Sequence, residues 1–248
     1  MKNVCFGVKI LTFNNPNKLK PMKEYVEEAI DCVRRQTYPH WKILLIGDHY
    51  EPHSEFVQLS RLAPKDKIVA VNLPRSPERE IHTGYNLWSC GGMTAFNFSL
   101  DLANELDLTH IANLDDDDIW FPRHLEFHAD SYNTDPNVVM VLTHGHFKLP
   151  NNILPKHCDA PRPFFDQSPV WPEKMGSIAG NSCNCACSWD FKRVPLRIKN
   201  TVETTPWAKQ AGDFWFWKEF ETMAVKGGYR MVLRPEITVF QRHTHRES

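Results

Sequence analysis

Near-continuous apolar runs alternate with amphipathic stretches of helical period through the first 120 residues, and this alternation limits the fold more than any other feature. The apolar runs cover residues 8–13, 41–46, 67–72 and 109–114, and the stretches between them include 21–36, 55–62 and 93–106. Apolar runs without polar alternation are typical of strands buried on both faces of a parallel sheet. The pattern therefore predicts an α/β fold with a Rossmann-like, mostly parallel central sheet flanked by helices. Its binding crevice should lie at the carboxyl ends of the strands.

The second half of the chain departs from this regular alternation. We expect a helix over 122–132, strands over 138–143, 180–189, 229–233 and 237–240, and a helix from 213 that ends at Gly227-Gly228. Six prolines fall between Pro150 and Pro172, and this density excludes regular structure there. A loop of this length indicates a binding loop or a mobile connection.

Composition narrows the partners and the compartment. The 248 residues are 42% apolar and 24% charged, with a net charge of −1, so charge gives no reason to expect a nucleic acid or a membrane surface as partner. The sequence shows no run of 18 apolar residues and no secretory signal, which predicts no membrane span and a cytoplasmic location. Seven cysteines, an odd number, fit a reducing compartment.

Three of the cysteines are spaced at every second residue. Cys183, Cys185 and Cys187 would share one face of a strand, where a thiol packs as a small apolar group. Zinc sites usually place two or more residues between paired cysteines. The spacing therefore favours packing over a metal site.

Four consecutive carboxylates, Asp115 to Asp118, follow the last apolar run of the first half. Carboxylates this close repel one another, and a hard divalent cation with oxygen ligands is a natural counter-charge. A solvated acidic loop, with Asp118 capping the helix that Pro122 opens, explains the same residues. The cluster alone leaves both interpretations open.

The order of several motifs resembles the family-2 glycosyltransferases with the GT-A fold. Residues 25–48 resemble that family's first helix and second strand, and residues 92–97 resemble its Gly-x-x-x-Ala-Arg-Asn helix start. Residues 113–122 resemble its Leu-Asp-x-Asp-Asp core, and residues 211–216 resemble its late Gly-Glu-Asp motif. Phe96 stands where that family usually has Arg, and Gly212 where Glu is common. The resemblance covers residues 4–245, and the second half matches least.

The resemblance implies a single GT-A domain over residues 1–248. Residues 1–120 would form the half that binds the nucleotide sugar, and residues 121–248 the half that binds the acceptor. The implied reaction is an inverting transfer of a sugar from UDP or another nucleoside diphosphate to a hydroxyl of a glycan or related acceptor, as in polysaccharide biosynthesis. Mn²⁺ or Mg²⁺ would assist by neutralising the diphosphate leaving group.

Within the DxD-type motif, the resemblance makes Asp117 the expected direct metal ligand and Asp115 a metal or ribose contact. Asp118 is expected to be a ligand or its neighbour. Asp116 is counted among the nucleotide contacts, although the alternation points it away from the crevice. The late His243 and His245 are expected to close over the metal or diphosphate, with a frayed terminus as the alternative.

Further donor contacts are expected near the strand ends. Thr12 and Phe13 end the first strand and Asp48 ends the second, where the resemblance implies contacts to the nucleobase; strand-end packing and an ordinary turn aspartate are the alternatives. Arg75 and Arg79 follow the third strand and are expected to meet base or phosphate, unless they are solvated loop charges. Asn97 joins this set through the second motif.

Asp213 is the candidate general base. An inverting transfer needs a carboxylate to take the proton of the acceptor hydroxyl as its oxygen attacks the anomeric carbon. The aromatic residues 214–217 could raise its pKa by desolvation. Asp213 would also serve as the N-cap of the final helix, and the two roles are compatible. Trp120, Trp171, Trp189 and Trp215 could stack on sugar rings, although core packing explains each one singly.

Two other classes of function fit part of the sequence. A metal-dependent nucleotidyl- or phosphotransferase also places aspartates at a sheet edge, but it usually carries a Gly-x-x-x-x-Gly-Lys loop, which is absent from this sequence. A catalytically silent sugar- or calcium-binding module would need no base at Asp213. The sequence sets neither the oligomeric state nor the identity of the sugar.

Overall fold

The computed structural model describes residues 4–83, 87, 90–147, 184–198 and 212–242. Its centre is an eight-stranded sheet in the order β3-β2-β1-β4-β7-β6-β8-β5. The strands are β1 (Phe6–Thr12), β2 (Trp41–Asp48), β3 (Ile68–Leu73), β4 (His110–Asn113), β5 (Ile119–Trp120), β6 (Val138–Phe147), β7 (Cys187–Trp189) and β8 (Arg230–Gln241). β1, β2, β3 and β4 are parallel, β6 pairs parallel with β8, and β7 and β5 join antiparallel.

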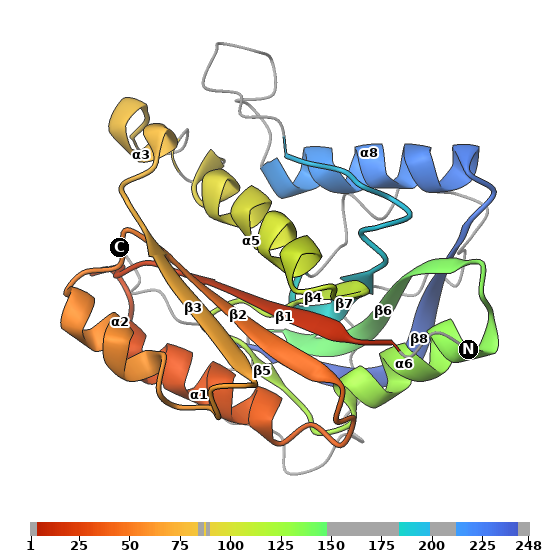
Figure 1. The fold of residues 1–248 in the computed structure, drawn as a ribbon, viewed down its shortest axis with the longest axis horizontal. Helices are drawn as coiled ribbons and strands as arrows, with labels where there is room; N and C mark the ends of the chain where they lie inside the picture. Colours follow the sequence, from red (N-terminus) through yellow and green to blue (C-terminus); the bar gives the residue numbers. More distant parts are fainter. Residues whose placement is uncertain (1–3, 84–86, 88–89, 148–183, 199–211, 243–248) are drawn as a thin grey trace.

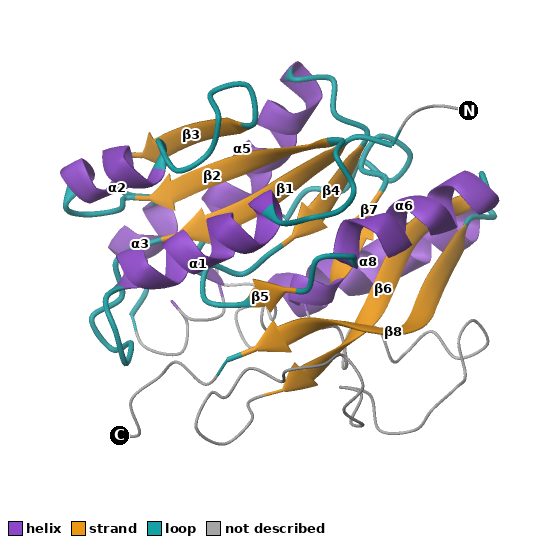
Figure 2. Ribbon diagram, turned by 90° about the horizontal axis from the view of Figure 1, so that it is seen from below, coloured by secondary structure: helices purple, strands orange, loops and turns teal. Residues whose placement is uncertain are grey.

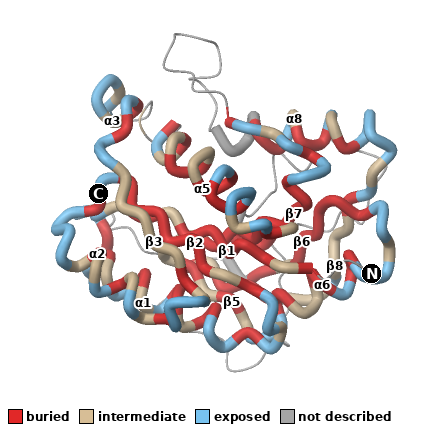
Figure 3. Tube along the Cα trace, in the orientation of Figure 1, coloured by how far each residue is buried: buried red, intermediate tan, exposed pale blue. Residues whose placement is uncertain are grey.

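Helices cover both faces of this sheet (Figure 1). One face carries α3 (Pro77–Ile81), α5 (Met93–Glu105) and α8 (Gly212–Lys226), and the other carries α1 (Met22–Arg34), α2 (His53–Leu59) and α6 (His124–Thr134). Two apolar clusters result: one includes Val26 and Leu125 on the α1 side, and the other includes Phe96 and Phe216 on the α5 side. In Figure 3 the strands between the two helical layers are largely buried. No helix among the described residues is long and apolar enough to span a bilayer.

The register of the parallel strands brings their carboxyl ends to one edge (Figure 2). Thr12 lies opposite Gly47, and Asp48 lies opposite Leu73. The turn that follows β4 starts at the same edge, because the Leu114 amide donates to the Lys9 carbonyl at 3.1 Å. Residues far apart in the sequence are thus collected where a doubly wound sheet places its ligands.

The predicted alternation of strands and helices in the first half is confirmed. The apolar stripe of α1 is buried as expected, and Gly92 begins α5 with a left-handed φ of 83° that favours glycine. Arg79, for which a loop charge was one interpretation, lies in a helix, because Pro77 opens the short helix α3. Glu78 of α3 accepts hydrogen bonds from the Thr94 amide at 2.9 Å and hydroxyl at 2.8 Å, which satisfies a donor at the start of α5.

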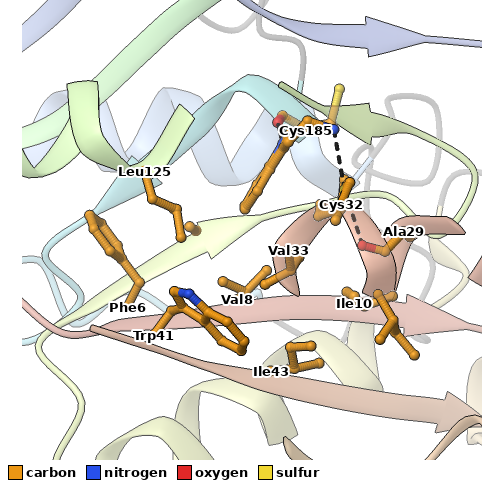
Figure 4. Packing of buried hydrophobic residues seen from close by; sticks show 14 of the residues in the cluster. Phe6, Val8, Ile10, Ala29, Cys32, Val33, Trp41, Ile43, Leu125 and Cys185 are labelled. Atoms are coloured by element: carbon orange, nitrogen blue, oxygen red, sulfur yellow. Dashed lines mark hydrogen bonds between the residues drawn. The ribbon is translucent and has the colours of Figure 1, made fainter. Parts of the chain in front are cut away.

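The second half differs more from the sequence prediction. Residues 230–241 form one long strand, β8, where two were expected, and β5 was not expected. The strand expected over 180–189 is limited to Cys187–Trp189, preceded by a 3₁₀ turn over Asn184–Ala186. Cys185 and Cys187 therefore lie in different apolar clusters, so the prediction that they share one face is wrong. Figure 4 shows Cys185 and Cys32 at the end of their cluster away from Phe6 and Trp41. Cys183 and the proline-rich stretch lie outside the described residues.

Gln36 connects α1 to the segment that follows the four aspartates. Its amide donates to the carbonyls of Phe121 at 2.9 Å and Cys32 at 3.2 Å, and its Oε1 accepts the Leu125 amide at 3.0 Å. The side chain is 8% exposed. One buried amide thus satisfies backbone groups of three segments, which a buried backbone requires.

We expect Gln36→Leu to lower the free energy of unfolding by about 3 kcal/mol, since each buried backbone group left without a partner costs roughly 1–3 kcal/mol. Urea denaturation of the purified protein measures this. The matched control is Gln58→Leu on α2, because Gln58 is exposed and its replacement should change stability by less than about 0.5 kcal/mol. Equal stability of the two variants would contradict the role given to Gln36.

Three buried histidines lie on α6 and β4: His124, His128 and His110. His124 Nδ1 lies 2.7 Å from the Thr238 hydroxyl, and His128 Nδ1 lies 2.6 Å from the Ser188 hydroxyl. Burial lowers the pKa of His110 and of His128 to about 3 and lowers the pKa of His124 well below its usual value. The folded protein therefore keeps these rings neutral at pH values where the unfolded chain protonates them.

The three histidines should accordingly each make a contribution to stability that is lost in acid. Between pH 6.5 and about pH 3 the unfolded state binds protons that the folded state refuses, so the free energy of unfolding falls by up to about 1.4 kcal/mol per pH unit for each histidine. His128→Gln should remove one such contribution from the slope of stability against pH, measured by urea denaturation between pH 4 and 7. His40→Gln at an exposed site should leave the slope unchanged. An unaltered slope in His128→Gln would contradict the buried neutral state.

Candidate functional site

The four aspartates form a tight turn between β4 and β5. The Asp118 amide donates to the Asp115 carbonyl at 3.1 Å, and the Phe121 amide donates to the Thr238 carbonyl at 2.8 Å just beyond. The turn therefore curls back at the sheet edge before the chain pairs with β8. This geometry separates the carboxylates, so that they have different surroundings.

Asp118 is the most buried of the four, at 1% exposure. Its Oδ1 accepts the Arg242 amide at 3.1 Å, whereas Oδ2 accepts no hydrogen bond from any residue in the described part of the chain. Burial raises the pKa of Asp118 well above its usual value, and Asp115 and Asp117 raise it further, while the Cys185 thiol and the Arg242 amide lower it. Oδ2 is thus a buried acceptor that a cation could satisfy.

Asp117 has a different partner, because the ammonium group of Lys18 forms an ion pair with its carboxylate. Lys18 is in the loop between β1 and α1 and is 9% exposed. This pair was missed by sequence reasoning, since a lysine in a polar loop has no distinguishing pattern. Asp117, the predicted direct metal ligand, is therefore paired with a cationic side chain of the same protein.

Asp116 packs toward the end of β1. Burial, followed by repulsion from Asp117, raises the pKa of Asp116 to about 8, while the Thr12 hydroxyl and Lys18 act in the opposite direction. The carboxylate thus lies near Thr12 at the end of β1, and the expectation that Asp116 turns away from the crevice stays a prediction. The expected nucleotide contact of Asp116 and Thr12 stays a prediction.

Arg242, directly after β8, packs against the acidic turn. Its guanidinium donates to the Asp117 carbonyl and pairs with Glu28 of α1, and it lies 4.7 Å from the centre of the Tyr25 ring. Sequence reasoning missed Arg242 because its partners are distant in the chain. The arginine ties the last strand to the first helix through the acidic turn.

A second group of residues surrounds a cavity of about 440 Å³ beside the ends of β1 and β2. Arg79 Nε donates to Asp48 Oδ2 at 2.6 Å, and the Arg79 guanidinium lies 4.0 Å from the centre of the Phe13 ring. Arg75, at the rim, donates to the Arg79 carbonyl at 3.2 Å. Asp48 is 3% exposed, and its Oδ1 has no hydrogen-bond partner among the described residues. The structure thus brings together Phe13, Asp48, Arg75 and Arg79 around one cavity.

The remaining predicted site residues are placed less closely. Both polar atoms of the Asn97 side chain bond to the Ile198 backbone, at 2.6 and 2.9 Å, which gives it a structural role; its predicted donor contact stays untested. Asp213 lies in the first turn of α8, and its side chain is outside the described residues. His243 and His245 are also outside them. Trp120 and Trp189 are buried in the core, at 2% and 0% exposure.

The acidic turn contains one group of side chains that fits a divalent cation. Ligand atoms of Asp115, Asp118 and Cys185 all lie within 4.8 Å of one another. Two carboxylate oxygens and one sulfur form a donor set that first-row divalent ions accept. The buried Asp118 Oδ2 supports this fit, since a carboxylate oxygen without a partner is costly in a protein interior.

No protein-family model matches the chain. A curated relative, the uncharacterized glycosyltransferase R139 of Acanthamoeba polyphaga mimivirus, is 26% identical over 240 residues, which cover 95% of this chain and 92% of that protein.

Two solved structures are similar over nearly the whole chain. Residues 1–349 of S. aureus TarS in complex with UDP-GlcNAc align with a TM-score of 0.64 and 16% identity, covering 99% of this chain and 60% of TarS. The mannosyltransferase PcManGT from Pyrobaculum calidifontis, in complex with GDP-Man and Mn²⁺, aligns with a TM-score of 0.55 and 13% identity, covering 95% of this chain and 56% of its own. The fold is that of the GT-A glycosyltransferases, and the predicted fold class is confirmed. The chain spans about 60% of the length of these TarS chains.

The pairing of Lys18 with Asp117 predicts competition with added cations. Lys18→Met should tighten Mn²⁺ binding by about tenfold, because the carboxylates lose a positive neighbour in a site of low dielectric. Calorimetric titration of Mn²⁺ into the protein without nucleotide measures the change. Lys20→Met is the matched control, since Lys20 pairs with Glu28 at the exposed end of the same loop. Weaker Mn²⁺ binding in Lys18→Met would contradict the competition.

Proposed function

We propose that this protein is a glycosyltransferase that moves a sugar from a nucleoside diphosphate to a hydroxyl acceptor, with inversion and with help from a divalent cation. The observation that carries the proposal is the position of Thr12 and Phe13. Thr12, at the end of β1, lies beside Asp116 of the acidic turn. The adjacent Phe13 lines the 440 Å³ cavity. A nucleoside diphosphate has the same layout, with an aromatic base at one end and two phosphates at the other.

The cavity suits a nucleoside. Phe13 presents an aromatic ring, and Asp48 has a carboxylate oxygen to accept an N–H of a base. Arg79 contacts both side chains, so its fork of donors is already positioned for a base carbonyl or a phosphate oxygen. Arg75 at the rim adds positive charge. The similar TarS and PcManGT structures are complexes with UDP-GlcNAc and GDP-Man, which agrees with such a ligand.

The acidic turn suits the diphosphate. A cation held there would neutralise charge that develops on the leaving phosphate. Lys18 is within reach of the same charge, because its ammonium group already occupies the edge of the turn. Asp115 and Asp118 are the carboxylates whose geometry fits the cation best. The cation would compete with Lys18 for the carboxylate of Asp117, the ligand expected from the sequence. The similar mannosyltransferase was solved with Mn²⁺.

Asp213 completes the proposal as general base. It would accept the proton of the acceptor hydroxyl while that oxygen bonds to the anomeric carbon and the nucleoside diphosphate leaves. The assignment is based on the sequence motif and on the start of α8, which lies over the sheet face that also carries α5 (Figure 1). His243 and His245 are proposed to approach the diphosphate from the end of β8, and the acceptor is proposed to bind to the second half.

A thermal-shift panel of nucleoside diphosphates and their sugars, with and without Mn²⁺, tests the proposed donor. The best ligand at a hundred times its Kd should stabilise the protein by about 2.7 kcal/mol, which raises the Tm by roughly 5–10 °C in a chain of this size. The shift should depend on Mn²⁺ and shrink in Arg79→Met. Adenosine monophosphate is the negative ligand control. No Mn²⁺-dependent shift with any member would overturn the proposal.

The base is tested separately from donor binding. Asp213→Asn should keep the thermal shift with the best donor and lose release of nucleoside diphosphate by at least about a hundredfold, since general base catalysis contributes 10²–10⁴-fold. Asp101→Asn, an exposed change on α5, is the control and should retain turnover. Full turnover in Asp213→Asn would show that the base is another residue.

A further inference from the structure

Cys185 is held next to the acidic turn by the fold itself. Its carbonyl accepts the Trp120 indole N–H at 2.6 Å, and the Trp120 amide donates to Cys32 Sγ at 3.3 Å. Trp120 is two residues beyond Asp118, so the 3₁₀ turn over Asn184–Ala186 and the acidic turn are fastened together. Cys185 is fully buried, and its neighbour Ala186 is fixed in turn by Thr143 at 3.4 Å.

The thiol is close enough to share a cation with two carboxylates. Oxygen ligands bind divalent ions at about 2.0–2.2 Å and thiolates at about 2.3 Å, so two ligand atoms of one ion are at most roughly 4.5 Å apart. The ligand atoms of Asp115, Asp118 and Cys185 lie within 4.8 Å of one another. Three ligand atoms at these distances from one ion lie roughly 3.5 Å apart in tetrahedral geometry, so a contraction of up to about 1 Å would bring all three onto one ion.

Asp118 gives an independent reason to place a cation here. The residue is 1% exposed, and its Oδ1 accepts a hydrogen bond from the Arg242 amide. Oδ2 is buried and accepts none from the described residues. A bound cation would stabilise a buried carboxylate oxygen in this state, and the Cys185 thiol lies within 4.8 Å of it as a further ligand.

We propose that Cys185 is the third protein ligand of the divalent cation, as a thiolate beside Asp115 and Asp118. Binding breaks the S–H bond, forms a metal–sulfur bond and releases the proton to solvent. A sulfur ligand selects against Mg²⁺ and Ca²⁺ and favours softer ions of the first row and Cd²⁺. This inference deepens the metal-assisted transfer proposed above and rests on it for its catalytic meaning.

Titration of the full chain with Co²⁺ under anaerobic conditions tests the ligand directly. Wild type should develop a near-ultraviolet thiolate-to-cobalt charge-transfer band that saturates at one ion per chain. Cys185→Ser should lose the band and lower the preference for Cd²⁺ over Mg²⁺ by at least about tenfold. Cys187→Ser, in the adjoining strand and in the other apolar cluster, is the matched control and should keep both.

Absence of the band in wild type at saturating Co²⁺, or its survival in Cys185→Ser, overturns the assignment. If Cys185→Ser does not fold, Asp118→Asn decides, because the amide keeps an acceptor for the Arg242 N–H but removes the charged ligand. Asp118→Asn must then lose the band, and an unchanged band overturns the site.

The outcome also separates this inference from the proposed function. A Mn²⁺-dependent thermal shift with a nucleotide sugar, but no thiolate band with Co²⁺, leaves the transferase in place and removes Cys185 from the site. A thiolate band without any response to nucleotide sugars keeps Cys185 as a metal ligand and removes the proposed transferase function.

Discussion

The structure depends on how four neighbouring carboxylates are tolerated at a buried sheet edge. Like charges this close cannot all remain ionised in an interior unless positive groups or protons balance them. The fold supplies Lys18 from the loop after β1, and Arg242 from the end of β8. The negative charge that these two cations leave unbalanced lies on Asp116 and Asp118, and burial raises the pKa of both.

This requirement links the two halves of the chain. Arg242 reaches α1 through Glu28, and Gln36 at the end of α1 holds the backbone just beyond the turn. The strands of the second half could therefore not be arranged independently of the first helix. The antiparallel pairing of β5 with β8 completes the same connection, since β5 begins directly after Asp118. The acidic turn is both the candidate site and a junction of the fold.

Sequence periodicity predicted the features that arise from local pattern. The strands β1 to β4, the stripe of α1 and the helix start at Gly92 follow from burial on two faces, helical spacing and backbone freedom. The gathering of Phe13, Asp48 and Arg79 around one cavity followed from the rule that parallel strands end at one edge. Lys18 and Arg242 could not be predicted, because their partners are 99 and about 125 positions away. Cys185 was misjudged because period two implies a strand only where the backbone is extended, and a 3₁₀ turn breaks it there.

The pairing of Lys18 with Asp117 explains how one site can hold strong charge without collapsing and still accept an anionic ligand. An ammonium group on a flexible stem loses little when it exchanges a carboxylate for a phosphate oxygen, since both are anionic acceptors. In the proposed reaction, the carboxylate that it leaves would be available to a cation arriving with the diphosphate. Two like exchanges, lysine to phosphate and aspartate to cation, would keep Lys18 and Asp117 paired. Thr12 and Phe13 matter for the same reason, because two adjacent residues at the end of β1 would set the distance between the place where charge is exchanged and the cavity where a base would be held.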